Sequence, residues 1–242
     1  KDVSLMYAGS SENTIEGLNL KVLKGQTIGV IGGTGSGKTS LINMIPRFYD
    51  ATKGEVLVNG TNVKEYTEEG LRNKIGIVPQ KAVLFKGTIR SNLLWGNESA
   101  TENDLMEALK QAQSYDFVMQ KENGIDSVVE QNGRNFSGGQ RQRLTIARAL
   151  VRKPEILILD DSASALDYTT DANLRKEIAK LKDMTVFIVS QRTASIMDAD
   201  QIVVLDDGNI MGIGTHKELL ENCEVYKEIY ESQFKKPEKE EM

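Results

Sequence analysis

An eight-residue segment, GGTGSGKT at residues 32–39, constrains the fold of this chain more than any other feature of its sequence. It follows the apolar run QTIGVI and precedes a helical pattern that Pro46 ends. The spacing G-x-x-x-x-G-K-[ST] between a strand and a helix is typical of a phosphate-binding loop in nucleotide-binding α/β proteins. The sequence therefore predicts backbone N–H groups that face phosphates at the N-terminus of a helix.

The loop also predicts which side chains contact the nucleotide. Lys38 reaches the β- and γ-phosphates, and the hydroxyl of Thr39 holds Mg²⁺. The residues expected to bind the nucleotide here are Gly32, Gly33, Thr34, Gly35, Ser36, Gly37, Lys38, Thr39 and Ser40. A glycine-rich loop with a chance lysine is the alternative, and the strand–loop–helix order argues against it.

A second run, ILILDD, ends a predicted buried strand on Asp160 and Asp161. Two carboxylates at the end of such a strand are costly unless they hold a metal or take part in chemistry. Phosphate-loop proteins need a carboxylate at a neighbouring strand end to hold Mg²⁺, and Asp160 fits this role. The alternative for Asp160 is that it caps the next helix.

Composition narrows the class of protein. The 242 residues are 39% apolar and 27% charged, as in ordinary soluble domains. The net charge of −5 argues against nucleic acid as a partner, and the single cysteine, Cys223, excludes a disulfide framework or a thiolate metal cluster. No run approaches the roughly 18 apolar residues of a membrane helix.

The periodicity of apolar residues indicates strands and helices in alternation. Strand patterns cover residues 3–7, 18–22, 26–31, 54–60, 74–80, 156–159, 186–190 and 202–205, and residues 87–151 read as mostly helical. Thr101 is a candidate N-cap, followed by an apolar stripe of Leu105, Leu109 and Ala112. Leu174, Ile178 and Leu181 mark another helix between two of the later strands.

The predicted fold class is α/β: a phosphate-loop core with an antiparallel β subdomain and an inserted helical lobe. We expect one domain over residues 1–242, with a core lobe at about 1–83 and 152–234 and a helical lobe at about 84–151. Residues 235–242 are charged and contain proline, so they are expected to form a disordered tail.

A third motif, SGGQ, combines Ser137, Gly138, Gly139 and Gln140. Ser137 and Gln140 have the spacing of a capping box, and the two glycines allow a ligand to approach the backbone. The helix that follows is expected to pack Leu144, Ala147 and Leu150 inward. This motif predicts a second helix N-terminus suited to an anion, although a purely structural role is equally compatible with it.

These motifs occur in the order found in the ABC ATPase family, which the sequence resembles over nearly its whole length. The resemblance implies that the nucleotide is ATP, that Tyr7 stacks on its adenine and that Gln80 is the Q-loop glutamine. It implies Mg²⁺ ligands at Thr39, Gln80 and Asp160. Residues 137–140 match the signature turn, residues 156–160 the Walker B strand, and residues 164–167 the D-loop with Asp167. Tyr7 is also compatible with a plain core position.

Two residues depart from the pattern of that family. The resemblance implies a glutamate after Walker B, which acts on the attacking water, but this chain has Asp161. It also implies a histidine that contacts the γ-phosphate after the next strand, where this chain has Gln191. The only histidine, His216, lies downstream and is expected to be structural. We interpret Asp161 and Gln191 as weakened catalytic residues; neutral drift in a working enzyme is the alternative.

The segment VLFKGTIRSNLLWG at residues 83–96 resembles the exporter branch, in which this region contacts the transmembrane domain. Trp95 fits that contact and the core of the lobe equally well. The resemblance implies two such domains facing head to tail at the cytoplasmic face of the cell membrane. We expect this chain to be one half of a heterodimer with a non-identical partner. We expect the chain to be an excised domain whose own ATP site hydrolyses weakly. The alternatives are a fully active homodimeric exporter ATPase and a soluble ABC ATPase outside transport.

Overall fold

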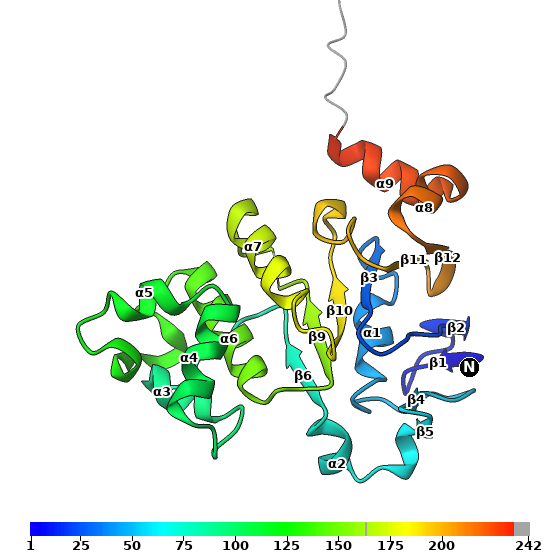
Figure 1. Ribbon diagram of the computed structural model, residues 1–242. Helices are drawn as coiled ribbons and strands as arrows, with labels where there is room; N and C mark the ends of the chain where they lie inside the picture. Colours follow the sequence, from blue (N-terminus) through cyan, green and yellow to red (C-terminus); the bar gives the residue numbers. More distant parts are fainter. Residues whose placement is uncertain (163, 235–242) are drawn as a thin grey trace, which may run out of the picture.

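A six-stranded sheet forms the centre of the computed structural model, which describes residues 1–162 and 164–234; the predicted tail at 235–242 lies outside them (Figure 1). The strands lie in the order β12-β11-β3-β10-β9-β6. Their bounds are β3 Thr27–Gly32, β6 Ile75–Val78, β9 Ile156–Asp160, β10 Thr185–Val189, β11 Gln201–Asp206 and β12 Asn209–Gly214. β12 runs antiparallel to β11, and the other neighbours are parallel. This mixed sheet with its helices confirms the predicted α/β fold.

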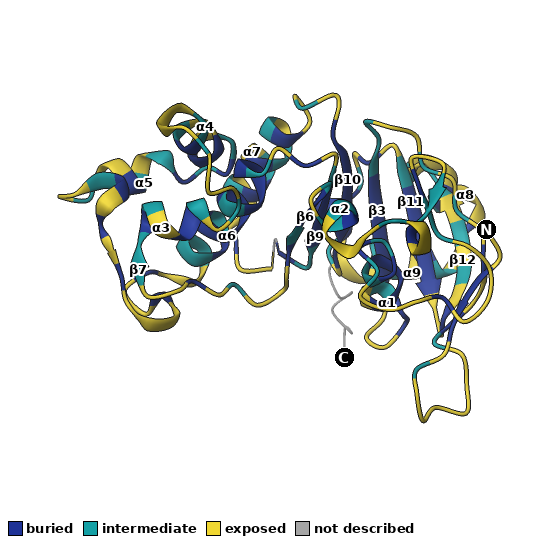
Figure 2. Ribbon diagram, turned by 90° about the horizontal axis from the view of Figure 1, so that it is seen from below, coloured by how far each residue is buried: buried dark blue, intermediate teal, exposed yellow. Residues whose placement is uncertain are grey.

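The central strands are apolar throughout because both faces of the sheet are covered. In β10, Val186 and Ile188 belong to one buried cluster, whereas Phe187 and Val189 belong to another. Successive side chains of a strand point to opposite faces, so the two clusters lie on the two sides of the sheet. A parallel sheet buried on both faces requires such continuous apolar runs. The strands are accordingly dark in the view coloured by burial (Figure 2).

The described residues contain nine α-helices: α1 Lys38–Asn43, α2 Glu68–Arg72, α3 Ile89–Leu94, α4 Glu102–Gln111, α5 Tyr115–Met119, α6 Gly138–Val151, α7 Tyr168–Ile178, α8 His216–Asn222 and α9 Glu224–Phe234. Four short 3-10 turns accompany them: η1 Val63–Glu65, η2 Gly124–Asp126, η3 Gln131–Gly133 and η4 Thr193–Ser195. None of these helices is long and apolar enough to cross a membrane within residues 1–162 and 164–234.

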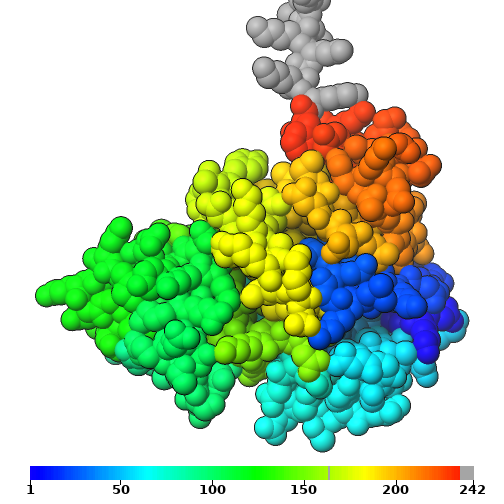
Figure 3. Space-filling view, in the orientation of Figure 1, coloured from blue at the N-terminus to red at the C-terminus, as the bar shows by residue number. Residues whose placement is uncertain are grey.

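Helices α3 to α6 gather on one side of the sheet, drawn in green in Figures 1 and 3. The predicted N-cap of α4 is confirmed, because Thr101 Oγ1 accepts a hydrogen bond from the Asp104 N–H at 3.3 Å. The predicted apolar stripe is also confirmed, since Leu105, Leu109 and Ala112 are all buried. The capping residue and the apolar spacing thus placed this helix correctly from local signals.

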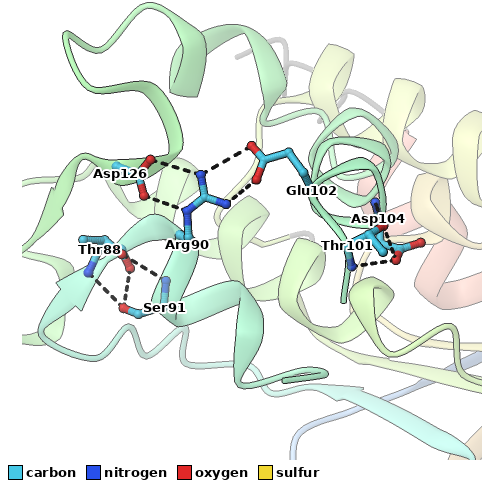
Figure 4. A network of polar contacts seen from close by, with 7 residues as sticks. All are labelled: Thr88, Arg90, Ser91, Thr101, Glu102, Asp104 and Asp126. Atoms are coloured by element: carbon cyan, nitrogen blue, oxygen red, sulfur yellow. Dashed lines mark hydrogen bonds and ion pairs between the residues drawn. The ribbon is translucent and has the colours of Figure 1, made fainter. Parts of the chain in front are cut away.

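A polar network joins the start of α4 to the rest of this helical group (Figure 4). The Arg90 guanidinium of α3 donates to Asp126 Oδ1 at 2.7 Å and pairs with Glu102, the first residue of α4. These carboxylates hold the pKa of Arg90 above its ordinary value. Lys153 pairs with Asp104 at 2.6 Å and so ties the end of α6 to the same turn.

Three two-stranded sheets complete the fold: β1 Val3–Leu5 with β2 Ile15–Leu18, β4 Leu57–Val58 with β5 Thr61–Asn62, and β7 Gly87–Thr88 with β8 Val128–Val129. The predicted strand at residues 18–22 is wrong, because β2 ends at Leu18. Its register pairs Leu5 with Ile15 and Val3 with Leu18, so the partner strand decides its bounds. Single-strand periodicity does not contain that information.

Candidate functional site

The predicted phosphate loop joins the carboxyl end of β3 to the N-terminus of α1. Gly37 has φ 94°, and a Cβ there would lie 2.7 Å from Ile15 Cδ1 and 2.9 Å from the Thr14 carbonyl oxygen. A side chain is therefore excluded on both conformational and steric grounds. At Gly33 and Gly35 an added Cβ would meet nothing within 4 Å, so this side of the loop is open to a ligand.

Lys38 lies over the loop rather than away from it. Its Nζ donates to the carbonyl oxygens of Gly32 and Gly33, at 2.9 and 2.5 Å, and lies 3.3 Å from Ser36 Oγ. Burial lowers the pKa of Lys38, and the charges of Asp161 and Asp160 oppose that shift. The ammonium group is thus held where phosphate oxygens would replace the backbone carbonyls as partners.

Two of the three predicted Mg²⁺ residues, Thr39 and Asp160, meet at the carboxyl ends of β3 and β9, with β10 between these strands, whereas Gln80 follows β6 and contacts Asp161 instead. Thr39 Oγ1 lies 3.5 Å from Asp160 Oδ1 and 3.4 Å from Asp160 Oδ2. Burial raises the pKa of Asp160, and the neighbouring charge of Asp161 adds to that effect. Hard oxygen ligands of this kind fit Mg²⁺, which keeps several sites for phosphate and water.

No group of three or more His, Cys, Asp or Glu side chains is arranged to hold a metal within residues 1–162 and 164–234. A magnesium ion at Thr39 and Asp160 would thus take its remaining ligands from phosphate, water or Gln80. This is the usual division of ligands for Mg²⁺ on a nucleotide, so the residues present fit the ion.

Asp161 follows β9 in a strained conformation, with φ 46°. Its N–H donates to the Val189 carbonyl oxygen at 2.9 Å, which holds the backbone in place. Its Oδ2 accepts a hydrogen bond from Gln80 Nε2 at 3.1 Å. Burial raises the pKa of Asp161, while the Gln80 hydrogen bond and the charges of Arg192 and Lys38 oppose the shift. The structure therefore brings Gln80 and Asp161 together.

Gln191 lies in the loop after β10 and is exposed. The next residue, Arg192, donates from its guanidinium to the carbonyl oxygens of Ser164 at 3.3 Å and Leu166 at 3.5 Å. Arg192 thus connects the Gln191 loop to residues 164–167, a link that sequence reasoning missed. No local motif marks it, because the contact depends on how β10 and α7 pack.

Tyr7 lies beside α1. Its hydroxyl is 2.8 Å from Ser40 Oγ, and its ring meets the Tyr49 ring edge-on with centroids 4.9 Å apart. The ring is half-buried against the apolar cluster on that side of the sheet. This placement next to the phosphate loop is compatible with adenine stacking and with a core role, so the stacking stays a prediction.

The predicted capping box at the start of α6 is confirmed. The Ser137 N–H donates to Gln140 Oε1 at 3.0 Å, and the Gln140 N–H donates to Ser137 Oγ at 3.2 Å. A Cβ on Gly138 would meet nothing within 4 Å, so the backbone is accessible there. A Cβ on Gly139 would lie 3.2 Å from the Ala165 carbonyl oxygen, which places this turn against residues 164–167.

Asp167 caps α7. Its Oδ1 accepts from the Thr170 N–H at 2.9 Å and its Oδ2 from Thr170 Oγ1 at 2.7 Å. These hydrogen bonds lower the pKa of Asp167. The expected structural role of His216 agrees with its surroundings, since its Nδ1 lies 2.7 Å from the hydroxyl of the buried Tyr226.

Comparison with known proteins places the chain in a family. A family model described as ABC transporter matches residues 15–164. The uncharacterized ABC transporter ATP-binding protein YfiB of Bacillus subtilis is 44% identical over 232 residues, which cover 96% of this chain and 40% of that protein. A putative multidrug export ATP-binding/permease protein of Staphylococcus aureus is 41% identical, with the same two coverages.

A solved structure of a bacterial Atm1-family ABC exporter with ATP bound has a TM-score of 0.92 and 33% identity, covering 97% of this chain and 41% of that one. The chain thus spans about 40% of the length of the relatives that it matches. The match of the family model over more than half of the residues, together with the fold, shows that the chain belongs to the ABC transporter family.

Proposed function

We propose that this chain is the ATP-binding domain of an exporter: it binds Mg-ATP and drives transport by a transmembrane domain of the same or an associated polypeptide. The relatives support this proposal, because one is named as a multidrug export ATP-binding/permease protein and this chain matches only 40% of it. The domain would act at the cytoplasmic face of the cell membrane. Its net charge of −5 supports the absence of a nucleic-acid partner.

In this proposal the open loop at Gly33 and Gly35 binds the phosphates, Lys38 pairs with the β- and γ-phosphates, and Tyr7 stacks on adenine. Thr39, Asp160 and Gln80 would hold Mg²⁺. When bound, the ion neutralises charge between the β- and γ-phosphates. The hydroxyl and carboxylate oxygens 3.4 Å apart support this assignment.

The signature turn would serve a second ABC domain rather than the phosphate loop of this chain. Its accessible Gly138 backbone and the N-terminus of the 14-residue helix α6 are suited to an anion. In a head-to-tail pair, residues 137–140 of this chain would complete the nucleotide site of the partner. ATP would then join the two domains, and its cleavage would allow them to separate.

The observation that carries the finer proposal, a weakly hydrolytic site, is Asp161 at the end of β9. Its carboxylate is one methylene, or about 1.5 Å, shorter in reach than a glutamate, and Gln80 already hydrogen-bonds it at 3.1 Å. A misplacement near 1 Å can cost about 10²-fold in rate. Gln191 is expected to lower the rate of hydrolysis further, since an amide cannot become cationic as a histidine can. A non-identical partner would then supply the competent site.

The test is steady-state ATP turnover by the unmodified chain and by the double variant Asp161→Glu with Gln191→His. We expect the double variant to be faster by about 10²-fold with little change in ATP affinity. Asp2→Glu is the matched control, because Asp2 has φ 47° and so presents the same substitution on a similar backbone. Rapid turnover by the unmodified chain would instead support the homodimeric, fully active exporter.

A further inference from the structure

The last described helix reaches the loop that carries Gln191. Gln233, near the end of α9, accepts hydrogen bonds at Oε1 from the Thr193 N–H and the Thr193 hydroxyl, both at 2.9 Å. Its Nε2 donates to the carbonyl oxygen of Gln191 at 2.7 Å. One side-chain amide therefore holds the backbone on both sides of Arg192. Figures 1 and 3 show α9, in red, next to the amber segment after β10.

Helix α9, which carries Gln233, packs against the rest of the protein. Tyr226 is fully buried in the apolar cluster that also contains Leu219 of α8. Ile229, one helical turn before Gln233, packs against the same apolar cluster. Packing thus places the Gln233 amide before it bonds the loop, which reduces the conformational entropy lost in making the three hydrogen bonds.

The partner of Gln233 is buried and polar. Thr193 is fully buried, whereas the Gln233 side chain that covers it is exposed, so removing Gln233 would take away the acceptor of the Thr193 N–H and hydroxyl and open both groups to solvent. The same loop is held from the opposite side, where Ser195 Oγ donates to Asp171 Oδ2 of α7 at 3.1 Å. The loop is therefore fixed at Thr193 and Ser195, and the exposed Gln191 lies just before these two fixed residues.

We infer that Gln233 is a positioning residue that directs the Gln191 side chain at the γ-phosphate by fixing the carbonyl of Gln191 and the amide of Thr193. This inference rests on the role of Gln191 in the proposed function. It predicts that α9 influences turnover without contacting the nucleotide. Loss of the Gln233 amide should lower kcat and leave the KM for ATP nearly unchanged, because ATP is bound chiefly by the phosphate loop.

The contact is tested first without any turnover, by amide hydrogen exchange of the 242-residue chain. Gln233→Ala should raise the exchange rate of the Thr193 amide by about 10-fold or more, since its acceptor is lost. Gln233→Glu keeps that acceptor and loses the donor to Gln191, so it should protect the Thr193 amide. Ser232→Ala is the control, because the Ser232 hydroxyl donates to the Ile229 carbonyl oxygen of the same helix at 2.7 Å.

Equal Thr193 exchange in Gln233→Ala and Ser232→Ala would overturn the contact itself, whatever the turnover. Thermal unfolding of each variant shows whether α9 is still folded. If Gln233→Ala releases α9 altogether, amides throughout that helix lose protection, and Gln233→Glu then provides the comparison.

The predicted effect of Gln233 on kcat is tested by a double-mutant cycle. The starting protein is the variant Asp161→Glu with Gln191→His, which is expected to hydrolyse ATP faster than the unmodified chain. Adding Gln233→Ala should lower kcat by about 10-fold, toward the loss expected for a small misplacement, with KM changed less than about 2-fold. In Asp161→Glu with Gln191→Ala, the same addition should change kcat less than about 2-fold, because no side chain is left to direct.

Equal losses in the two backgrounds would refute positioning through Gln191. If the unmodified chain hydrolyses ATP rapidly, the proposal of a weakly hydrolytic site fails. Gln233→Ala is then added to the unmodified chain and to its Gln191→Ala variant, and the two losses in kcat are compared. The exchange result does not depend on either rate. The exchange measurement and the cycle therefore test the role of Gln233, whereas the turnover of the unmodified chain tests the proposed function.

Discussion

Arg175 of α7 offers a comparison between a buried and an exposed ion pair on one guanidinium. Its Nε donates to Asp171 Oδ2 at 3.3 Å, and its Nη1 donates to Asp198 Oδ2 at 3.4 Å. The Asp171 side chain is 6% exposed, whereas that of Asp198 is 85% exposed. The two contacts are alike in length and differ in burial, so Asp171→Ala and Asp198→Ala should have very different effects on stability.

The expected loss in the free energy of unfolding depends on which groups each substitution leaves without a hydrogen-bond partner. Asp171→Ala removes the buried partner of the Arg175 guanidinium, which still pairs with the exposed Asp198, and it removes the acceptor of the buried Ser195 hydroxyl. An unsatisfied buried hydroxyl costs about 1–3 kcal/mol, and breaking a buried pair at one partner about 3–5 kcal/mol in all. Asp198→Ala removes a solvated partner, and such pairs contribute about 0–1 kcal/mol.

Urea unfolding at pH 7 measures both variants. We expect Asp171→Ala to lower the free energy of unfolding by about 3–5 kcal/mol and Asp198→Ala by less than about 1 kcal/mol. Adding Ser195→Ala to Asp171→Ala should cost less than Ser195→Ala alone, because the hydroxyl has already lost its partner. Similar losses in the two aspartate variants would refute the reasoning that burial, and not contact distance, decides the contribution.

Three further predictions concern single residues. Leu109→Ala, at a fully buried site of α4, should lower the free energy of unfolding by about 3–5 kcal/mol in urea, against under about 0.5 kcal/mol for an exposed surface substitution. Ser137→Ala should lose about 1 kcal/mol from the cap of α6, seen as a fall in Tm of about 2–4 °C; an unchanged Tm would contradict the capping box. Because burial raises the pKa of Asp161, its ionised form opposes folding above that pKa, and the cost disappears as the pH falls below the unfolded value near 3.8. Asp161→Asn should therefore stabilise the chain at pH 7 and lose that advantage by about pH 3, and a gain that is constant with pH would contradict this.

Local chemistry explains which parts of the fold could be predicted. The N-caps at Thr101 and Ser137 bond backbone groups within three residues, so the sequence around them is sufficient. The phosphate loop is similar, because its glycines lie within eight consecutive residues and a glycine readily adopts the φ of 94° found at Gly37. The candidate residues at the strand ends could also be named, since apolar runs identify the strands that carry Asp160 and Asp161.

The features that could not be predicted from the sequence depend on packing between distant segments. Strand β2 is displaced from the predicted residues 18–22 because its bounds depend on pairing with β1. Gln233 carries no motif, and it contacts the Gln191 loop only because Tyr226 docks α9 on the apolar cluster. The link from Arg192 to Leu166 likewise depends on the placement of α7 beside β10. These contacts join distant residues, and periodicity in one segment cannot encode them.

The position of β3 in the sheet has a consequence for biosynthesis. Its two neighbours are β10 and β11, through pairs such as Thr27 with Val186 and Ile28 with Gln201, so both are translated long after it. A nascent chain on the ribosome would expose both edges of β3 until those strands emerge, which invites chaperones or misassociation. A prematurely terminated polypeptide ending before Thr185 would contain every residue of the phosphate loop and still lack the framework that shapes it.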